Sequence, residues 1–198
     1  MAGTWSFELG MGDVMALFDD LQKQGTFGVL VSRLCPMTRA HQTLIQLLID
    51  AFGEKYIVFL GSSNAKISIP QFFSHRERVG FARIVFPNLR VIGIPDYGND
   101  VEWMGALDDY LDVVGARGEK VVFVAGSFED VAYFHEIGRS VFTVDRFSGE
   151  HTIPISGSQV RSALIERQLL DGLLDARLIS PIRDLFDKKW PEFLKLHA

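Results

Sequence analysis

The chain has 198 residues, a net charge of −5 and a pI near 5.5. Its length fits one domain, and a composition of 47% apolar and 23% charged residues is typical of a folded globule and excludes a disordered chain. Without a basic excess, the chain is not expected to bind nucleic acid. The single cysteine, Cys35, excludes an intrachain disulfide and a cysteine zinc site.

The N-terminal segment and the apolar runs bear on localisation. No apolar run reaches the ~20 residues that a membrane span needs. Residues 1–12 lack the basic start and the long apolar core of a secretory signal. We therefore expect a cytoplasmic protein that does not bind membranes.

Short apolar runs alternate with helical patterns along the chain. The predicted strands are Phe27–Val31, Tyr56–Leu60, Leu89–Ile94, Lys120–Ala125 and Val141–Val144. The predicted helices are His41–Phe52, His75–Phe86, Glu102–Val114 and Phe128–Ile137. This alternation predicts an α/β fold with a Rossmann-like open parallel sheet of about five strands and helices on both faces. Ligands of such sheets bind outside the carboxyl ends of the strands, so the loops there are the place to look for a site.

The two ends of the chain are predicted to be helical. Residues 1–26 form an N-terminal extension with an amphipathic helix over Met11–Gln24, which serves either an intramolecular contact or a homo-oligomer interface. Ser158–Ala198 reads as wholly helical, with breaks at Pro181 and Pro191. Within it, residues 166–198 form a C-terminal segment that packs on the core, residues 27–165.

The loop after the first strand carries the first candidate site. Thr38 is placed to cap a helix, and His41 lies three residues further on, facing the same way. With free backbone N–H groups and the charge of Arg33, this helix start suits a phosphate. The alternative is that Thr38 is only a cap and His41 only a solvated first-turn residue. The chain has neither a Walker loop nor a GxGxxG fingerprint.

A second helix start, at Ile155–Arg161, has similar chemistry. Ser156 or Ser158 can cap the helix, and Arg161 lies on its first turn. A serine hydroxyl, backbone N–H groups and a guanidinium together suit a triphosphate tail or a pyrophosphate leaving group. A plain capped helix with a solvated arginine is the alternative.

Both segments resemble signatures of the nucleotidyltransferase superfamily. Residues 38–41 resemble its (His/Thr)-x-Gly-His signature, with Ala40 in place of glycine, and residues 32–37 resemble the lead-in of its NMN adenylyltransferases, with Ser32 in place of glycine. Residues 155–161 resemble the second signature, Ile-Ser-(Ser/Gly)-Thr-x-(Ile/Val)-Arg, with Ser158 in place of threonine. The two segments occur in the family's order.

Three further segments resemble elements of these enzymes. Residues 61–65 resemble a Gly-Ser-Ala loop, and residues 70–78 resemble a Pro-Phe-Thr-x-x-Glu-Arg element ending at Arg78. Residues 94–103 resemble the Ile-Pro-Asp-…-Asn-…-Trp stretch of the archaeal-type enzymes. The resemblance implies that Trp103 stacks on a nicotinamide ring and that Asn99 contacts its amide. A surface ion pair for Arg78 and core packing for Trp103 are the alternatives.

The resemblance implies transfer of AMP from ATP to NMN, giving NAD and pyrophosphate. It assigns catalysis to His41, Thr38 and Arg161. The implied ATP- and phosphate-binding residues are Arg33, Arg78, Gly126, Ser127, Ser156 and Ser158. The implied NMN-binding residues are Ser62, Asp96, Asn99 and Trp103. Mg²⁺ is expected to be bound through the ATP phosphates, without protein ligands.

Two other functions stay open. The chain could be a related nucleotidyltransferase that uses another phosphate acceptor. Because Ser32 and Ala40 replace glycines, it could also be a catalytically weak nucleotide sensor. The sequence does not decide between NMN and nicotinic acid mononucleotide, which differ by one amide-to-carboxylate change.

Overall fold

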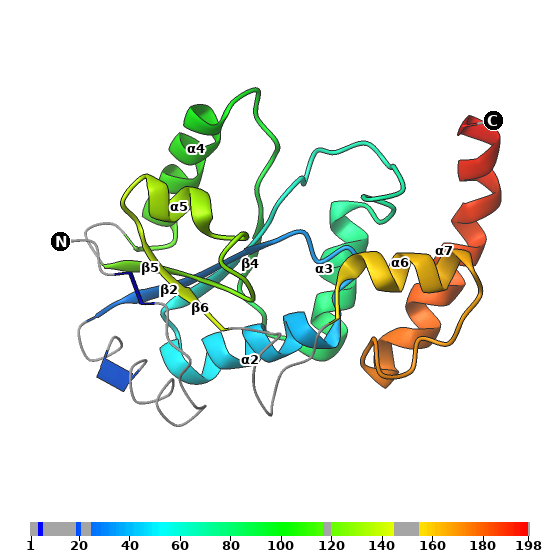
Figure 1. The fold of residues 1–198 in the computed structure, drawn as a ribbon, viewed down its shortest axis with the longest axis horizontal. Coiled ribbons are helices and arrows are strands. Elements are labelled where there is room, and N and C mark those ends of the chain that lie inside the picture. The colour runs from blue at the N-terminus through cyan, green and yellow to red at the C-terminus, as the bar shows by residue number, and fades with distance from the viewer. Residues whose placement is uncertain (1–3, 6–18, 21–24, 117–119, 145–154, 198) are drawn as a thin grey trace.

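The computed structural model describes residues 4–5, 19–20, 25–116, 120–144 and 155–197. In this part of the chain, six parallel strands form one sheet in the order β1-β6-β5-β2-β3-β4 (Figure 1). The strands are β1 (Thr4–Trp5), β2 (Phe27–Ser32), β3 (Tyr56–Leu60), β4 (Val91–Gly93), β5 (Val121–Ala125) and β6 (Ser140–Thr143). The predicted α/β fold is confirmed, with one addition: β1 is an edge strand inside the segment predicted to be a helical extension.

Helices cover both faces of the sheet, as predicted. They are α2 (Arg39–Phe52), α3 (His75–Val85), α4 (Asp100–Val113), α5 (Ala132–Glu136), α6 (Gly157–Ile165) and α7 (Ala176–His197). Helices α2, α3, α6 and α7 share one apolar core with the sheet, and α4 and α5 share the other. Figure 1 shows α4 and α5 on one side of the strands and α2 on the opposite side. The helix predicted over residues 11–24 lies outside the described residues, except for Asp19 and Asp20, which are helical.

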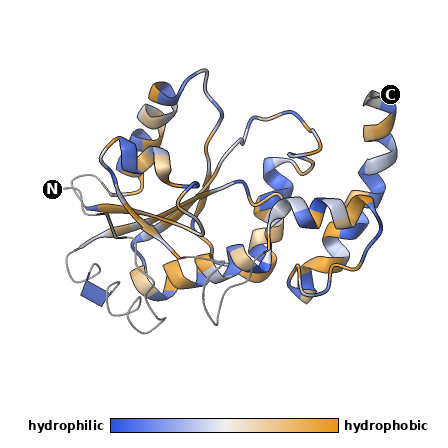
Figure 2. Cartoon of the chain, viewed as in Figure 1, coloured by the Kyte–Doolittle hydropathy of each residue, from blue (hydrophilic) through white to orange (hydrophobic). Residues whose placement is uncertain are grey.

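The strands are apolar on both faces because both faces are covered. In β3, Ile57 and Phe59 point to the α4 side, while Val58 and Leu60 point to the α2 side. Figure 2 shows the same contrast between largely hydrophobic strands and helices of mixed polarity. Gly28 lets α2 approach the sheet, since a Cβ there would lie 2.4 Å from the Phe52 ring. This close packing holds the end of α2 against the start of β2.

The C-terminal region differs from the prediction. Helix α6 ends at Ile165. Two residues further on, Arg167 has a φ of 60°. The Arg167 amide donates to the Leu164 carbonyl, and the Gln168 amide donates to the Ala163 carbonyl. This is a Schellman cap, which usually needs glycine and was therefore not recognised in the sequence. Residues 166–175 are not helical. Helix breaks at the two prolines were predicted wrongly, because α7 runs through both of them.

Burial explains why α7 tolerates its prolines. Leu178, Ile182 and Phe186 are 0–2% exposed, at four-residue spacing. Burying each such side chain stabilises the fold by about 1.5–3 kcal/mol, so the three together offset most or all of the roughly 3 kcal/mol that each of the two internal prolines costs. Phe186 packs on Phe72 with ring centres 4.8 Å apart. The predicted C-terminal segment thus packs on the core residues beside α3.

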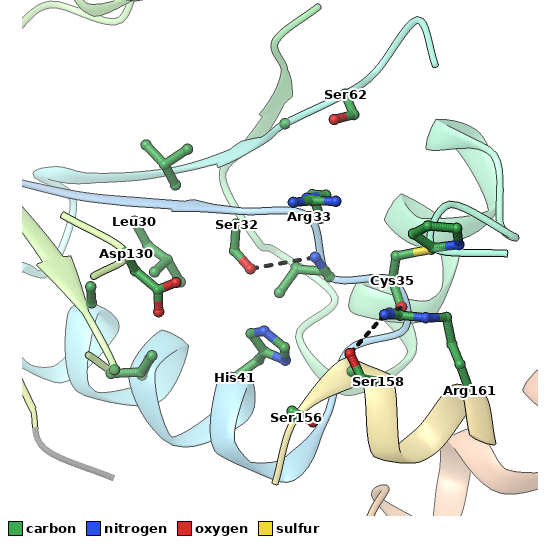
Figure 3. Close-up of a pocket in the computed structure, with 18 of the residues that line it drawn as sticks. Leu30, Ser32, Arg33, Cys35, His41, Ser62, Asp130, Ser156, Ser158 and Arg161 are labelled. Atoms are coloured by element: carbon green, nitrogen blue, oxygen red, sulfur yellow. Dashed lines mark hydrogen bonds between the residues drawn. The ribbon is translucent and has the colours of Figure 1, made fainter. Parts of the chain in front are cut away.

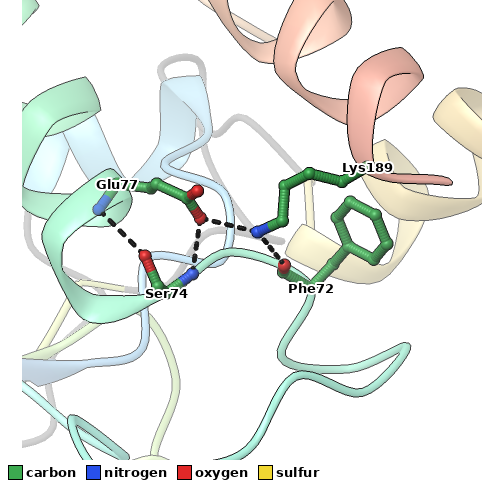
Figure 4. Close-up of polar contacts among 4 residues, drawn as sticks. All are labelled: Phe72, Ser74, Glu77 and Lys189. Carbon is green, nitrogen blue, oxygen red and sulfur yellow. Dashed lines mark hydrogen bonds and ion pairs between the residues drawn. The ribbon is translucent and has the colours of Figure 1, made fainter. Parts of the chain in front are cut away.

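An ion pair joins α7 to the start of α3 (Figure 4). Lys189 Nζ donates to Glu77 Oε2 at 2.8 Å and to the carbonyl of Phe72 at 3.2 Å. Glu77 Oε2 also accepts from the amide of Ser74, the N-cap of α3. The C-terminal helix therefore contacts and stabilises the start of the helix that carries Arg78.

Among the described residues, no helix combines the length and hydropathy required to cross a bilayer.

Candidate active site

A cavity of about 740 Å³ lies at the carboxyl ends of β2 and β5. The chain order reverses between these two strands, which is where open parallel sheets bind ligands. The loops after β2, β3, β4 and β5 and the start of α6 all contribute to its wall (Figure 3). Nine of the predicted site residues line it: Arg33, His41, Ser62, Asp96, Trp103, Gly126, Ser156, Ser158 and Arg161.

Thr38 and His41 form a capping box at the start of α2. The Thr38 amide donates to His41 Nδ1 at 3.1 Å, and Thr38 Oγ1 lies 2.8 Å from the same nitrogen. An amide donor requires a lone pair on Nδ1, so the neutral ring carries its proton on Nε2. Thr38 is fully buried and does not line the cavity, whereas His41 does. Thr38 thus orients the ring, and His41 presents a hydrogen-bond donor.

The start of α6 meets the β2 loop at the same cavity. Ser156 caps α6, while Arg161 Nη1 donates to the Cys35 carbonyl at 2.7 Å and Nη2 to Ser158 Oγ at 2.9 Å. A Cβ on Gly157 would lie 3.3 Å from the Cys35 carbonyl oxygen, so the glycine permits this approach. The two predicted phosphate elements, more than 110 residues apart in sequence, therefore form one surface.

Arg33 and Arg161 give this part of the cavity a positive charge. Burial lowers the pKa of Arg161, and the charge of Arg33 lowers it further, although an arginine stays protonated near neutral pH. Within the described part of the chain, neither guanidinium forms an ion pair. Two cations that have no ion pair among the described residues, beside a helix N-terminus, favour an anion, since an anion between them relieves their repulsion.

The far side of the cavity carries Ser62, Asp96 and Trp103. Ser62 Oγ donates to Asp96 Oδ1 at 3.0 Å, and Asn64 holds the backbone of Asp96 through two hydrogen bonds. Trp103 is half-buried, with its ring 6.0 Å from that of Phe134, so it both packs in the core and lines the cavity. Asn99 does not line the cavity: it caps α4 by accepting from the Glu102 amide at 2.9 Å.

At the end of β5, the structure adds a carboxylate that the sequence did not indicate. Gly126 lines the cavity, but Ser127 does not, and its hydroxyl donates to Asp130 Oδ2 at 3.1 Å. Asp130 lines the cavity on the side of Leu30 (Figure 3). It belongs to none of the segments singled out in the sequence as candidate sites, so only the fold brings it to the site.

Arg78 is not placed as a phosphate ligand. Its side chain is 0% exposed and does not line the cavity. Nη1 donates to the carbonyls of Arg33 at 2.6 Å and Gly61 at 2.9 Å, and Nη2 donates to that of Ser62 at 2.9 Å. The surface ion pair that was the alternative is also absent from the described residues. The guanidinium instead lies beneath two of the loops that form the cavity wall, those after β2 and β3.

The described residues contain no group of three or more His, Cys, Asp or Glu side chains that could hold a metal ion. Among the described residues that line the cavity, two carry carboxylates, Asp96 and Asp130. Each can supply one oxygen to a hard divalent cation that brings its other ligands with it.

Several solved structures that match this fold are named as adenylyltransferases. A bifunctional NMN adenylyltransferase/ADP ribose pyrophosphatase from Francisella tularensis matches with a TM-score of 0.69 and 14% identity, over 82% of this chain and 50% of that chain. The same protein with AMP and a manganese ion matches with a TM-score of 0.65 and 15% identity, over 82% and 49%. A Plasmodium falciparum nicotinic acid mononucleotide adenylyltransferase with NaAD matches with a TM-score of 0.57 and 8% identity, over 81% and 96%.

At these identities the likeness shows a shared fold, the one that the resemblance implied. The chain spans about half the length of the Francisella structures. No protein-family model matches the chain, and no curated protein matches it.

Proposed function

We propose that this chain is a nucleotidyltransferase that moves AMP from ATP to a pyridine mononucleotide, giving a dinucleotide and pyrophosphate. The main support is the cavity, where the oriented His41 ring, Arg33 and Arg161 face one volume at the switch point of the sheet. Trp103 supports a pyridine ring as the acceptor's base, since an indole face attracts a cationic ring. The fold is also that of structures named as adenylyltransferases.

The proposed reaction needs no protein nucleophile. A phosphate oxygen of the mononucleotide attacks the α-phosphorus of ATP, and the bond from that phosphorus to the bridging oxygen of the β-phosphate breaks. Pyrophosphate leaves with the electron pair of the broken bond. His41 donates from Nε2 to an oxygen of the reacting phosphate, and Arg161 neutralises charge that develops on the leaving group. Catalysis therefore rests on positioning and charge stabilisation.

Mg²⁺ is proposed to enter bound to the ATP phosphates, where it would neutralise part of their charge. Asp130 and Asp96 are the described carboxylates able to hold one open position of such an ion. Mn²⁺ is a second candidate, since a structure of the same fold contains it.

The test is an incubation of the purified chain with Mg²⁺, ATP and either NMN or nicotinic acid mononucleotide, following dinucleotide and pyrophosphate together. The proposal expects both products in equal amounts, and the rates with the two acceptors give the acceptor preference. Product with neither acceptor, from a chain that still binds Mg-ATP, would contradict the proposal. It would favour either another phosphate acceptor or a nucleotide sensor.

A further inference from the structure

Arg78 is a buried cation whose described hydrogen-bond partners are all oxygens of neutral amides, although the charge of Asp96 is near enough to favour the cation. Besides the three backbone carbonyls of Arg33, Gly61 and Ser62, the Gln71 side chain is a partner. With its amide oxygen turned toward the guanidinium, Gln71 accepts from Nε at 3.0 Å and from Nη2 at 2.9 Å. An arginine fully removed from water needs such a set of acceptors, so this environment is built around it.

The backbone that Arg78 holds is in an unfavourable conformation. Leu34 and Ser62 are non-glycine residues with φ of 44° and 54°. Such conformations are unfavourable for residues with a Cβ and persist only where the surroundings enforce them. Arg78 binds the carbonyl just before Leu34 and the carbonyl of Ser62 itself, while Arg161 binds the carbonyl just after Leu34. The two arginines therefore fix the β2 loop on both sides of its strained residue.

The direction of these carbonyls matters for an anionic ligand. Arg33 and Ser62 both line the cavity, but their carbonyl oxygens accept from a guanidinium that lies outside it. A carbonyl oxygen turned into the cavity would repel a phosphate, whereas one held by Arg78 does not. A lysine could not replace Arg78, because an ammonium lacks the planar fork that reaches several carbonyls at once.

We propose that Arg78 is a positioning residue for the nucleotide site. It holds the loops after β2 and β3 in their strained conformation, directs their carbonyls away from the cavity, and so keeps Arg33 and Ser62 on its wall. It acts through these loops without touching the nucleotide. The inference rests on the proposed function for the class of ligand, a nucleoside polyphosphate.

The experiment compares Arg78→Lys with Arg76→Lys, a change at an exposed arginine of the same helix. Two properties are measured: affinity for Mg-ATP by calorimetry, and backbone amide hydrogen exchange by mass spectrometry. For Arg78→Lys we expect at least a 10-fold loss of affinity and at least 10-fold faster exchange in residues 32–35 and 61–64. Exchange in the β3 strand should stay unchanged, and Arg76→Lys should match the wild type within twofold.

The outcomes separate positioning from direct contact. Weaker binding with unchanged exchange in both loops would overturn the proposal and favour a direct phosphate contact. Unchanged affinity would overturn it as well. If Arg78→Lys does not fold, Gln71→Leu takes its place, because it removes one hydrogen-bond acceptor of the guanidinium. It must show weaker Mg-ATP binding and faster exchange in the two loops, both smaller than expected for Arg78→Lys. Wild-type affinity and exchange in Gln71→Leu would refute the proposal.

Turnover gives a separate readout. A wild-type chain that makes no dinucleotide refutes the proposed function, yet the Mg-ATP affinity and the exchange of the loops still decide the role of Arg78. In an active chain, we expect Arg78→Lys to raise the KM for ATP about 10-fold or more, while Arg76→Lys leaves it unchanged.

Discussion

His41 is held at Nδ1 by backbone and side-chain groups of Thr38, so the neutral ring carries its proton on Nε2 before any ligand binds. A preorganised donor of this kind stabilises charge that develops in a transition state, at no cost of reorganisation during the reaction. The capping box normally uses Glu or Gln at this position. A histidine there keeps the cap and adds a donor to the cavity.

We expect His41→Ala to lower kcat by about 100-fold or more, the usual loss for one such donor, while changing Mg-ATP affinity only a few-fold. The matched control is Gln46→Ala, an exposed position on the same helix, which should keep wild-type turnover. Steady-state kinetics and calorimetry measure the two effects. A His41→Ala variant that retains wild-type kcat would remove His41 from the mechanism.

His75 gives a prediction about pH and stability. Burial and, to a lesser extent, the charge of Arg78 lower its pKa below the ordinary value of about 6.5. Its Nε2 is buried and has no hydrogen-bond partner among the described residues, and a Cβ on Gly93 would lie 2.4 Å from that nitrogen. The folded protein therefore resists a proton that the unfolded chain accepts.

Between the lowered pKa and about 6.5, the unfolded chain binds more protons, so stability falls as the pH drops through this range. His75→Phe keeps a ring at the position and removes the titration. Urea unfolding at pH 7.5 and 5.5 should show a smaller loss of stability for His75→Phe than for the wild type. An identical loss in both proteins would assign the acid sensitivity to other groups.

Helix α7 affects the site through the start of α3. Burial raises the pKa of Glu77, but hydrogen bonds from Lys189 and Ser74 outweigh it, so the pKa lies below its usual range. The Lys189 and Glu77 side chains are only 19% and 26% exposed. Removing the lysine would thus leave a carboxylate poorly solvated at the helix that carries Arg78.

We expect Lys189→Met to lower the free energy of unfolding by about 1–3 kcal/mol, because it leaves a charged acceptor without its donor. Lys188→Met changes a neighbouring lysine that is exposed, and it should cost less than about 0.5 kcal/mol. Urea denaturation of both variants provides the comparison. Equal effects would mean that the pair with Glu77 contributes nothing of its own.

Elements whose signals are local could be predicted from the sequence. The strands β2, β3 and β5 are short apolar runs, and α2 and α6 begin at capping residues. The boundaries of these strands and of α2, and the start of α6, therefore fall within two residues of the prediction. Helix α5 is shorter than predicted because its regular turns start only at Ala132. The end of α6 could not be predicted, because the residue with left-handed backbone that follows a helix is usually glycine, and here it is Arg167.

The cavity was predictable only where strand ends determine it. Arg33, His41 and Arg161 follow strands or start helices, and the fold brings such positions to one edge of the sheet. Arg78 stands in a segment that reads as a capped surface helix. Its burial depends on loops 17 and 45 residues away, which no local pattern reveals. Asp130 likewise reaches the cavity only through the path of the loop after β5.

A ligand that contacts several of these loops should stabilise the whole molecule. The cavity joins β2, β5 and α6, so a nucleotide bound there links segments from across the chain. At 100 times its Kd, a ligand that binds only the folded state adds about 2.7 kcal/mol. For a chain of this size, that corresponds to a rise in Tm of roughly 5–10 °C.

Mg-ATP should therefore raise the Tm by this amount, and adenosine, which lacks the phosphates, should raise it far less. Arg161→Met should reduce the rise in Tm with Mg-ATP. It removes one of the two arginines that line the cavity, and it removes the hydrogen bond from the guanidinium to the Cys35 carbonyl. Differential scanning fluorimetry over a series of ligand concentrations measures all three. A rise in Tm with adenosine equal to that with Mg-ATP would mean that the base and ribose supply the binding energy. That result, or a full rise in Tm with Mg-ATP in Arg161→Met, would contradict a phosphate site between α2 and α6.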